Sequence, residues 1–166
     1  MKLGFIDIEA SGLGDNSFPL EIGWTKDGID IHEFFIKPHV SWDIEEWDPN
    51  AENLHGISKD FILENGINSI DIALIMNEHL SGYTLLSDSH LNDIKWINKL
   101  FVSNEIKREF KIVSIDLFLN KLGLTDDQVH QAFFEARKLS PPNNSVYADV
   151  KFMFEAVTIG MNSVKK

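Results

Sequence analysis

The sequence has no cysteine and no long apolar run, and each absence excludes a class of protein. Without cysteine the chain forms neither disulfides nor thiolate metal sites, which favours a cytoplasmic protein. No stretch of about 18 apolar residues is present, so we expect neither a transmembrane helix nor a membrane partner. The N-terminal residues 1–10 turn acidic too early for a secretory signal peptide.

Basic residues are also scarce, with 15 Lys and Arg against 26 Asp and Glu and a formal net charge of −11. A protein that coats duplex DNA presents a basic face to the phosphates. The acidic balance therefore argues against a duplex-coating protein. It leaves room for an enzyme that acts on small phosphate esters, particularly one whose carboxylates hold divalent cations that reverse the local field.

The hydrophobic patterns predict one α/β domain over residues 1–166 with a mixed five-stranded sheet flanked by helices. Asp27-Gly28 is a strong hairpin signal, so the first three strands are expected to be antiparallel. The predicted strands are residues 2–9, 19–27, 30–38, 83–89 and 110–115. The predicted helices, with Ser58 and Thr125 as N-caps, are residues 59–65, 69–82, 91–104, 116–123, 125–139 and 145–163.

Two carboxylates, Asp7 and Glu9, stand one residue apart at the end of the first predicted strand. Residues i and i+2 of a strand point to the same side, so these two side chains share a face. Mg²⁺ and similar hard cations bind carboxylate oxygens. The pair is therefore half of a cation site or, since such pairs are common in any chain, a solvated strand end.

Residues 7–13, "DIEASGL", resemble the first motif of the DEDD family of 3′–5′ exonucleases, the group that includes ribonuclease T and the proofreading subunit of DNA polymerase III. Glu21, Ile22 and Gly23 match a later E-I-G stretch of that family, and residues 53–58, "NLHGIS", resemble an H-G-I-S segment that precedes a helix. The residues that match the first motif, in order, are Asp7, Glu9, Ala10, Ser11, Gly12 and Leu13.

The segment "YTLLSDSHLNDIKWINKLF" is similar to the family's second motif, an Asp near the start of a helix that follows a short strand. The resemblance gives the metal-binding role to Asp93. Asp88 is the alternative, and it is otherwise interpreted as a turn or helix-capping carboxylate. Trp96 is expected in the core, with base stacking as the other option.

The third motif departs from the family's histidine branch, which has H-x-A-x-x-D on the last helix. "NSVYAD" puts Asp149 at the metal position and Asn144 at the histidine position, whereas "HQAFFE" supplies His130 but a Glu135 for the Asp. We prefer the first alignment because it follows a proline-containing loop and opens a long C-terminal helix. Tyr147 is too close to Asp149 for the family's tyrosine branch.

The resemblance implies a ribonuclease H-like fold and a metal-dependent 3′–5′ exonuclease. Such an enzyme hydrolyses phosphodiester bonds at the 3′ end of single-stranded DNA or RNA, or of short oligonucleotides, and releases nucleoside 5′-monophosphates. It also implies two Mg²⁺ or Mn²⁺ ions held by Asp7, Glu9, Asp93 and Asp149. A homodimer is a further option, since many relatives are dimers. The residues expected to contact the terminal nucleotide are Ala10, Ser11, Gly12, Leu13 and His55.

The asparagine in the third motif keeps a second interpretation open. Asn144 has no basic nitrogen and cannot take a proton from an attacking water as the family's histidine does. His90 or His130 are the substitutes that the sequence offers. Without a substitute, the chain is a catalytically impaired exonuclease fold that binds nucleic acid or nucleotides. A third interpretation is a structural or protein-binding domain whose acids are only solvated surface.

Overall fold

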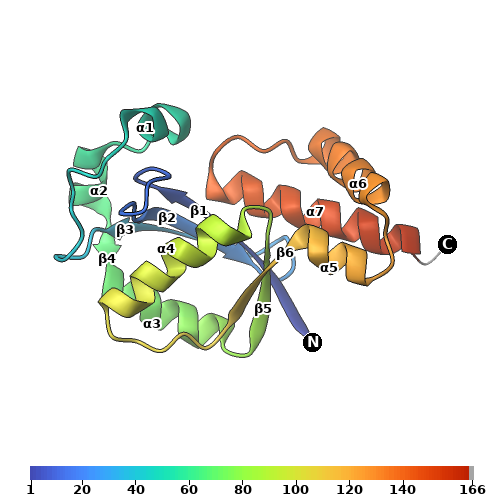
Figure 1. The fold of residues 1–166 in the computed structure, drawn as a ribbon, viewed down its shortest axis with the longest axis horizontal. Coiled ribbons are helices and arrows are strands. Elements are labelled where there is room, and N and C mark those ends of the chain that lie inside the picture. The colour runs from blue at the N-terminus through green and yellow to red at the C-terminus, as the bar shows by residue number, and fades with distance from the viewer. Residues whose placement is uncertain (165–166) are drawn as a thin grey trace.

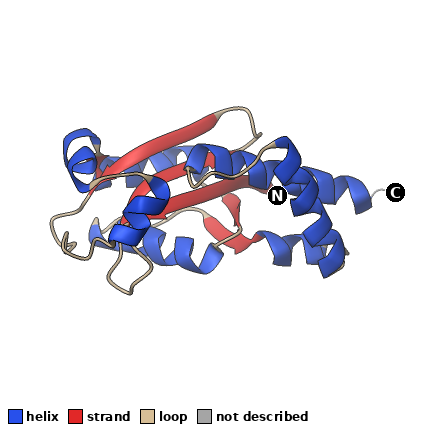
Figure 2. Cartoon of the chain, turned by 90° about the horizontal axis from the view of Figure 1, so that it is seen from above, coloured by secondary structure: helices blue, strands red, loops and turns tan. Residues whose placement is uncertain are grey.

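The computed structural model describes residues 1–164, in which a six-stranded sheet lies between helices on both faces (Figures 1 and 2). Residues 165 and 166 of the predicted domain lie outside the described residues. The elements in chain order are β1 (Lys2–Ala10), β2 (Pro19–Thr25), β3 (Ile31–Lys37), α1 (Pro49–His55), α2 (Lys59–Asn65), β4 (Ile67–Asn68), α3 (Ser69–Leu80), β5 (Tyr83–Ser87), α4 (His90–Ser103), β6 (Lys111–Ser114), α5 (Ile115–Lys121), α6 (Asp126–Leu139) and α7 (Val146–Val164).

The sheet has the strand order β4-β3-β2-β1-β5-β6, and the predicted mixed α/β class is confirmed. β1, β2 and β3 form the expected antiparallel meander, while β5 pairs parallel with both β1 and β6. All five predicted strands form. A sixth strand, β4, was missed because its two residues, which pair parallel with β3, are too few to show a period.

All six predicted helices form, and α1 is an additional one. Ser58 and Thr125 cap their helices as expected, each accepting a hydrogen bond from a backbone N–H of the first turn. α1 carries the same kind of signal: Asp48 is its N-cap, Pro49 follows, and Gly56 ends it in the left-handed conformation at φ 75°. No helix within residues 1–164 is long and apolar enough to cross a bilayer.

The central strand β1 divides the apolar residues between two cores, one on each face of the sheet. Ile6 and Ile8 pack into the core that contains residues of α3 and α4, whereas Phe5 packs into the core made with α5, α6 and α7. Side chains alternate along a strand, so Asp7 and Glu9 point to the same face as Phe5. The sequence thus directs both carboxylates toward α7.

A close approach between α7 and the sheet depends on Gly23. Gly23 pairs with Asp7 in the β1–β2 ladder. A Cβ atom at position 23 would lie 2.7 Å from side-chain atoms of Val146, the first residue of α7. Only glycine lets the first turn of α7 lie this close to β2, and that turn carries Asp149.

We predict that Gly23→Ala lowers the free energy of unfolding by about 1–3 kcal/mol, because the added methyl group must displace the start of α7. Gly14→Ala is the control, since nothing lies within 4 Å of a Cβ at that position. The control should stay within about 0.5 kcal/mol of the unmodified protein. Urea unfolding measures both, and equal stability of Gly23→Ala and the unmodified protein would contradict the packing argument.

Candidate metal centre and adjoining pocket

Three acidic side chains converge at the end of β1. Asp7 and Glu9 from β1 and Asp149 from the first turn of α7 each offer a carboxylate oxygen, and these oxygens all lie within 4.8 Å of one another. Glu135, the alternative to Asp149, instead lies on α6 and pairs with Lys138 at 2.9 Å. The geometry therefore brings together the carboxylates of the preferred alignment.

Asp93 lies at the same edge of the sheet, since β1 and β5 are parallel and α4 begins just after β5. Its side chain is 1% exposed, and Ser87 Oγ donates a hydrogen bond to Asp93 Oδ2 at 2.5 Å. Asp93 Oδ1 and Asp7 Oδ2 are buried and accept no hydrogen bond within residues 1–164. Such orphaned oxygens are rare in folded proteins, and a bound cation satisfies them.

Burial and mutual repulsion make these acids unusually weak. Desolvation, followed by the charge of Asp93, raises the pKa of Asp7 well above its usual range. Desolvation raises the pKa of Glu9 to about 7, with the charge of Asp149 adding to it, and burial raises the pKa of Asp93 to about 8. Burial also raises the pKa of Asp149. Clusters of shifted pKa values mark functional sites more often than structural ones.

Asp88 is a fifth carboxylate near this centre. Burial of the Asp88 carboxylate raises its pKa, and the backbone N–H groups of Asp88 and Ser89 oppose that shift. Its charge nonetheless raises the pKa values of Asp7, Asp93 and Asp149. Asp88 thus adds its negative charge to the field at Asp7, Asp93 and Asp149.

Asn144 lies in the loop that leads into α7, exposed and in the left-handed conformation at φ 58°. The neighbouring Asn143 N–H donates a hydrogen bond to Asp149 Oδ1 at 3.1 Å. Burial raises the pKa of Asp149, and the backbone N–H groups of Asn143 and Asn144, which both interact with its carboxylate, lower it. The loop therefore holds the Asp149 side chain through its backbone.

The two histidines considered as substitutes for the missing base line other hollows. His90, at the start of α4, borders a cavity of about 430 Å³ formed with residues of β6 and α5, such as Ile112 and Phe118. His130, exposed on α6, borders a separate hollow with Asp116 and Asp126. Neither is among the residues that line the pocket beside Glu9.

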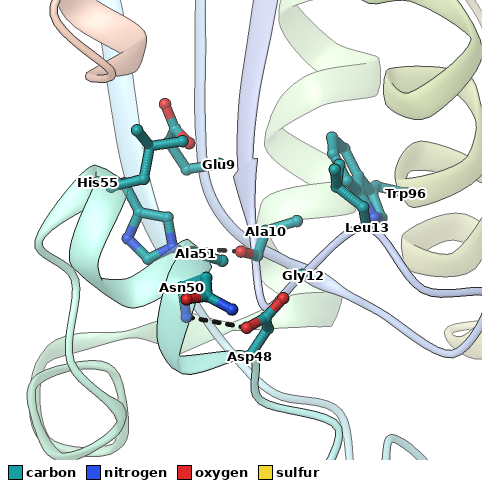
Figure 3. Close-up of a pocket in the computed structure, with 10 residues that line it drawn as sticks. Glu9, Ala10, Gly12, Leu13, Asp48, Asn50, Ala51, His55 and Trp96 are labelled. Atoms are coloured by element: carbon teal, nitrogen blue, oxygen red, sulfur yellow. Dashed lines mark hydrogen bonds between the residues drawn. The ribbon is translucent and has the colours of Figure 1, made fainter.

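A pocket of about 220 Å³ opens beside Glu9, between the end of β1 and α1 (Figure 3). Four of the residues expected to contact a nucleotide line it, namely Ala10, Gly12, Leu13 and His55. Ser11 does not: it is fully buried, and its Oγ accepts a hydrogen bond from the Phe18 N–H at 3.0 Å. The full lining is Glu9, Ala10, Gly12, Leu13, Asp48, Asn50, Ala51, Leu54, His55 and Trp96.

His55 is fixed in one tautomer. Its Nδ1 accepts a hydrogen bond from the Ile57 N–H at 3.0 Å, so the ring proton is on Nε2, which donates to the Ala10 carbonyl at 3.2 Å (Figure 3). Desolvation lowers the pKa of the ring. With both nitrogens engaged, His55 is a wall of the pocket and has no free basic nitrogen.

The loop that carries Leu13 is tied to α4, the helix of Asp93. Lys95 Nζ donates to the Leu13 carbonyl at 2.9 Å, and Trp96 Nε1 donates to Ser17 Oγ at 2.8 Å. Trp96 is 5% exposed, as expected for a core residue, whereas the Leu13 side chain is 72% exposed at the pocket. The Lys95 amine is thus bonded to the backbone carbonyls of Leu13 and Gly14.

The fold is that of a ribonuclease H-like α/β domain, as in the exonuclease structures that it resembles. The described structure resembles E. coli exonuclease I in complex with a dT13 oligonucleotide, with a TM-score of 0.67 and 16% sequence identity over 92% of this chain. It also resembles exonuclease I from Methylocaldum szegediense, with a TM-score of 0.69 and 15% identity over 97% of this chain. The chain spans about two fifths of either neighbour, 39% and 40% of their lengths.

No family model matches the sequence, and no curated protein matches it. The structural likeness therefore establishes the fold, which confirms the ribonuclease H-like expectation. Four residues of the pocket were not predicted from the sequence, namely Asp48, Asn50, Ala51 and Leu54. The sequence does indicate the helix that carries them, because the N-cap Asp48, Pro49 and the terminal Gly56 are typical start and stop residues of a helix.

We predict that stability falls as pH rises from about 6.5 to 9 in the presence of a chelator. Glu9, with a pKa of about 7, and Glu21 and Asp93, with pKa values of about 8, bind protons in the folded state that the unfolded chain has already lost. Folding is therefore less favourable once pH passes these folded pKa values. Burial lowers the pKa values of His32 and His55, so their effect is confined to lower pH.

Thermal melts at pH 6.5 and pH 9 measure this effect, with the lower melting temperature expected at pH 9. Asp93→Asn should reduce the difference, because its amide has no proton to lose. A melting temperature that is equal or higher at pH 9 would show that the buried acids do not destabilise the fold.

Proposed function

We propose that the chain is a metal-dependent 3′–5′ exonuclease of the DEDD type that acts on single-stranded DNA or RNA and on short oligonucleotides. The observation that carries the proposal is the convergence of Asp7, Glu9 and Asp149 within 4.8 Å, beside a pocket, on a fold shared with exonuclease I. The proposal comprises one catalytic domain over residues 1–166 in the cytoplasm, as a monomer or a homodimer.

Two cations, Mg²⁺ or Mn²⁺, fit the acids that the fold brings together. Glu9, Asp149 and one oxygen of Asp7 would hold the first ion. Asp7 Oδ2 and Asp93 Oδ1, both buried and without a hydrogen-bond partner in the described chain, would hold the second. When bound, such a pair of cations activates water and stabilises the leaving oxygen of a phosphodiester. Hydrolysis at the 3′ end would release a nucleoside 5′-monophosphate.

The pocket supports an exonuclease because it is small and adjoins the carboxylate cluster through Glu9. About 220 Å³ is less than the roughly 300–1,000 Å³ of most ligand sites, so it suits one nucleotide. Leu13 is mostly exposed at its edge and can lie against a base, in the way that apolar side chains stack on single strands. The net charge of −11 also favours a short contact with one strand end over a long one.

Replacing Asp7 tests the proposal. Asp7→Asn keeps the shape of the side chain but removes its charge, so Mn²⁺-dependent trimming of a 5′-labelled oligonucleotide should fall by about 10²–10³-fold. Asp60→Asn, at an exposed position in the first turn of α2, should leave the rate unchanged. Full activity of Asp7→Asn, or no trimming by the unmodified protein, would refute the proposed reaction.

A second candidate function follows from Asn144. The position where the histidine branch has its base holds an amide here, and His90 and His130 border other hollows. The chain would then be a catalytically impaired exonuclease fold that binds nucleic acid or nucleotides.

Asn144→His decides between the two functions. Asn and His both tolerate the left-handed backbone at this position, so the substitution should fold. If the base alone is missing, the trimming rate should rise by about 10²-fold or more, in the range that general-base catalysis contributes. Fast trimming by the unmodified protein, with no gain in Asn144→His, would exclude the impaired form.

A further inference from the structure

The pocket has two chemically different ends (Figure 3). Glu9, part of the carboxylate cluster, lies at one end, and Asp48 and Asn50 lie at the opposite end of the view. Most of the remaining lining is apolar, as at Leu13 and Trp96. In a mostly apolar pocket, a few polar groups decide the orientation and identity of the ligand. Asp48 and Asn50 belong to none of the motifs that predicted the site.

Asp48 is held rigidly. Its N–H donates a hydrogen bond to the Ser11 carbonyl at 2.7 Å, and its Oδ1 accepts one from the Asn50 N–H at 2.8 Å. Its Cβ lies 3.0 Å from the place that a Cβ at position 12 would take, so Gly12 makes room for it. A side chain fixed from several sides is preorganised for recognition.

One oxygen of this carboxylate, Oδ2, accepts no hydrogen bond from residues 1–164. An ionised carboxylate only accepts hydrogen bonds, and Asp48 is half-buried, so a ligand that displaces water from Oδ2 must offer a donor in its place. The Asn50 amide can donate or accept, and His55 has both ring nitrogens engaged. Asp48 is therefore the lining residue that can distinguish a ligand with a hydrogen-bond donor from a ligand with an acceptor.

We propose that Asp48 selects terminal nucleotides whose base is adenine or cytosine, a specificity that rests on the proposed exonuclease function. A nucleotide whose phosphate lies at the carboxylate cluster directs its base toward Asp48. Adenine and cytosine carry an amino donor at the ring position where guanine, thymine and uracil carry a carbonyl, which repels a carboxylate. The protein then prefers 3′ ends in A or C to ends in G, T or U.

Calorimetry with dCMP and dUMP in the presence of Mn²⁺ tests this preference. The two ligands are matched in size and differ at the amino or carbonyl group and the neighbouring ring proton. The unmodified protein should bind dCMP about tenfold more tightly, in line with one charge-assisted hydrogen bond. Asp48→Asn keeps an oxygen for the Asn50 N–H, and Asn caps a helix as well as Asp does, but it replaces Oδ2 with a donor.

In Asp48→Asn the ratio of the two affinities should fall to about one or reverse, with an unchanged melting temperature. Asp60→Asn, exposed on α2, should keep the original ratio. An unchanged ratio in Asp48→Asn overturns the assignment. A preference for CMP over dCMP with no preference between the bases also overturns it, because the donor is then the 2′-hydroxyl.

The outcome is separable from that of the proposed function. Equal affinity for dCMP and dUMP, together with Asp7-dependent trimming, overturns the selectivity and leaves the exonuclease intact. No affinity for either nucleotide and no trimming overturn both.

Discussion

Repulsion among buried carboxylates is the constraint around which this molecule is built. Asp7 is surrounded by the charges of Asp93, Asp149, Glu9 and Asp88, and each of them raises its pKa. Within residues 1–164 no Lys or Arg is among the charges that act on these acids, and Lys95, the lysine bonded to the Leu13 loop, donates to backbone carbonyls. Burying these acids together lowers the free energy of unfolding, and the packing of the surrounding structure offsets that cost. Such local costs are usual at functional sites.

The fold holds these acids by sharing them among three elements. β1 lies inside the sheet and points Asp7 and Glu9 to one face, parallel β5 brings α4 and its Asp93 to the same edge, and α7 closes over β2 at Gly23 with Asp149. The two hydrophobic cores on either side of β1 fix the positions of these elements relative to one another. Among the described residues, Asp7 Oδ2 and Asp93 Oδ1 are buried without a hydrogen-bond partner, and a cation would satisfy both.

The strands and most helices could be predicted because they follow from short-range patterns, whereas Asp93 and Asp149 were assigned to the carboxylate site by resemblance to a family. Alternation along β1 places Asp7 and Glu9 on one face, and the caps at Ser58 and Thr125 fix where helices start. The pocket could not be predicted in full, because Asp48 reaches it through a tertiary contact with Gly12 that no local pattern encodes. Ser11, which belongs to a motif expected to contact the substrate, is buried instead, and its Oγ accepts a hydrogen bond from the Phe18 N–H.

Calorimetric titration with Mn²⁺ at pH 7 and pH 9, in buffers of different ionisation enthalpy, tests the central claim most directly. If the buried acids form the cation site, Mn²⁺ must displace protons from groups whose pKa values lie at about 7 and 8, including Glu9 and Asp93. We expect binding with net proton release at pH 7 and much smaller release at pH 9. No binding at millimolar Mn²⁺, as for a domain whose acids are only solvated surface, or binding without proton release at pH 7, would contradict the account.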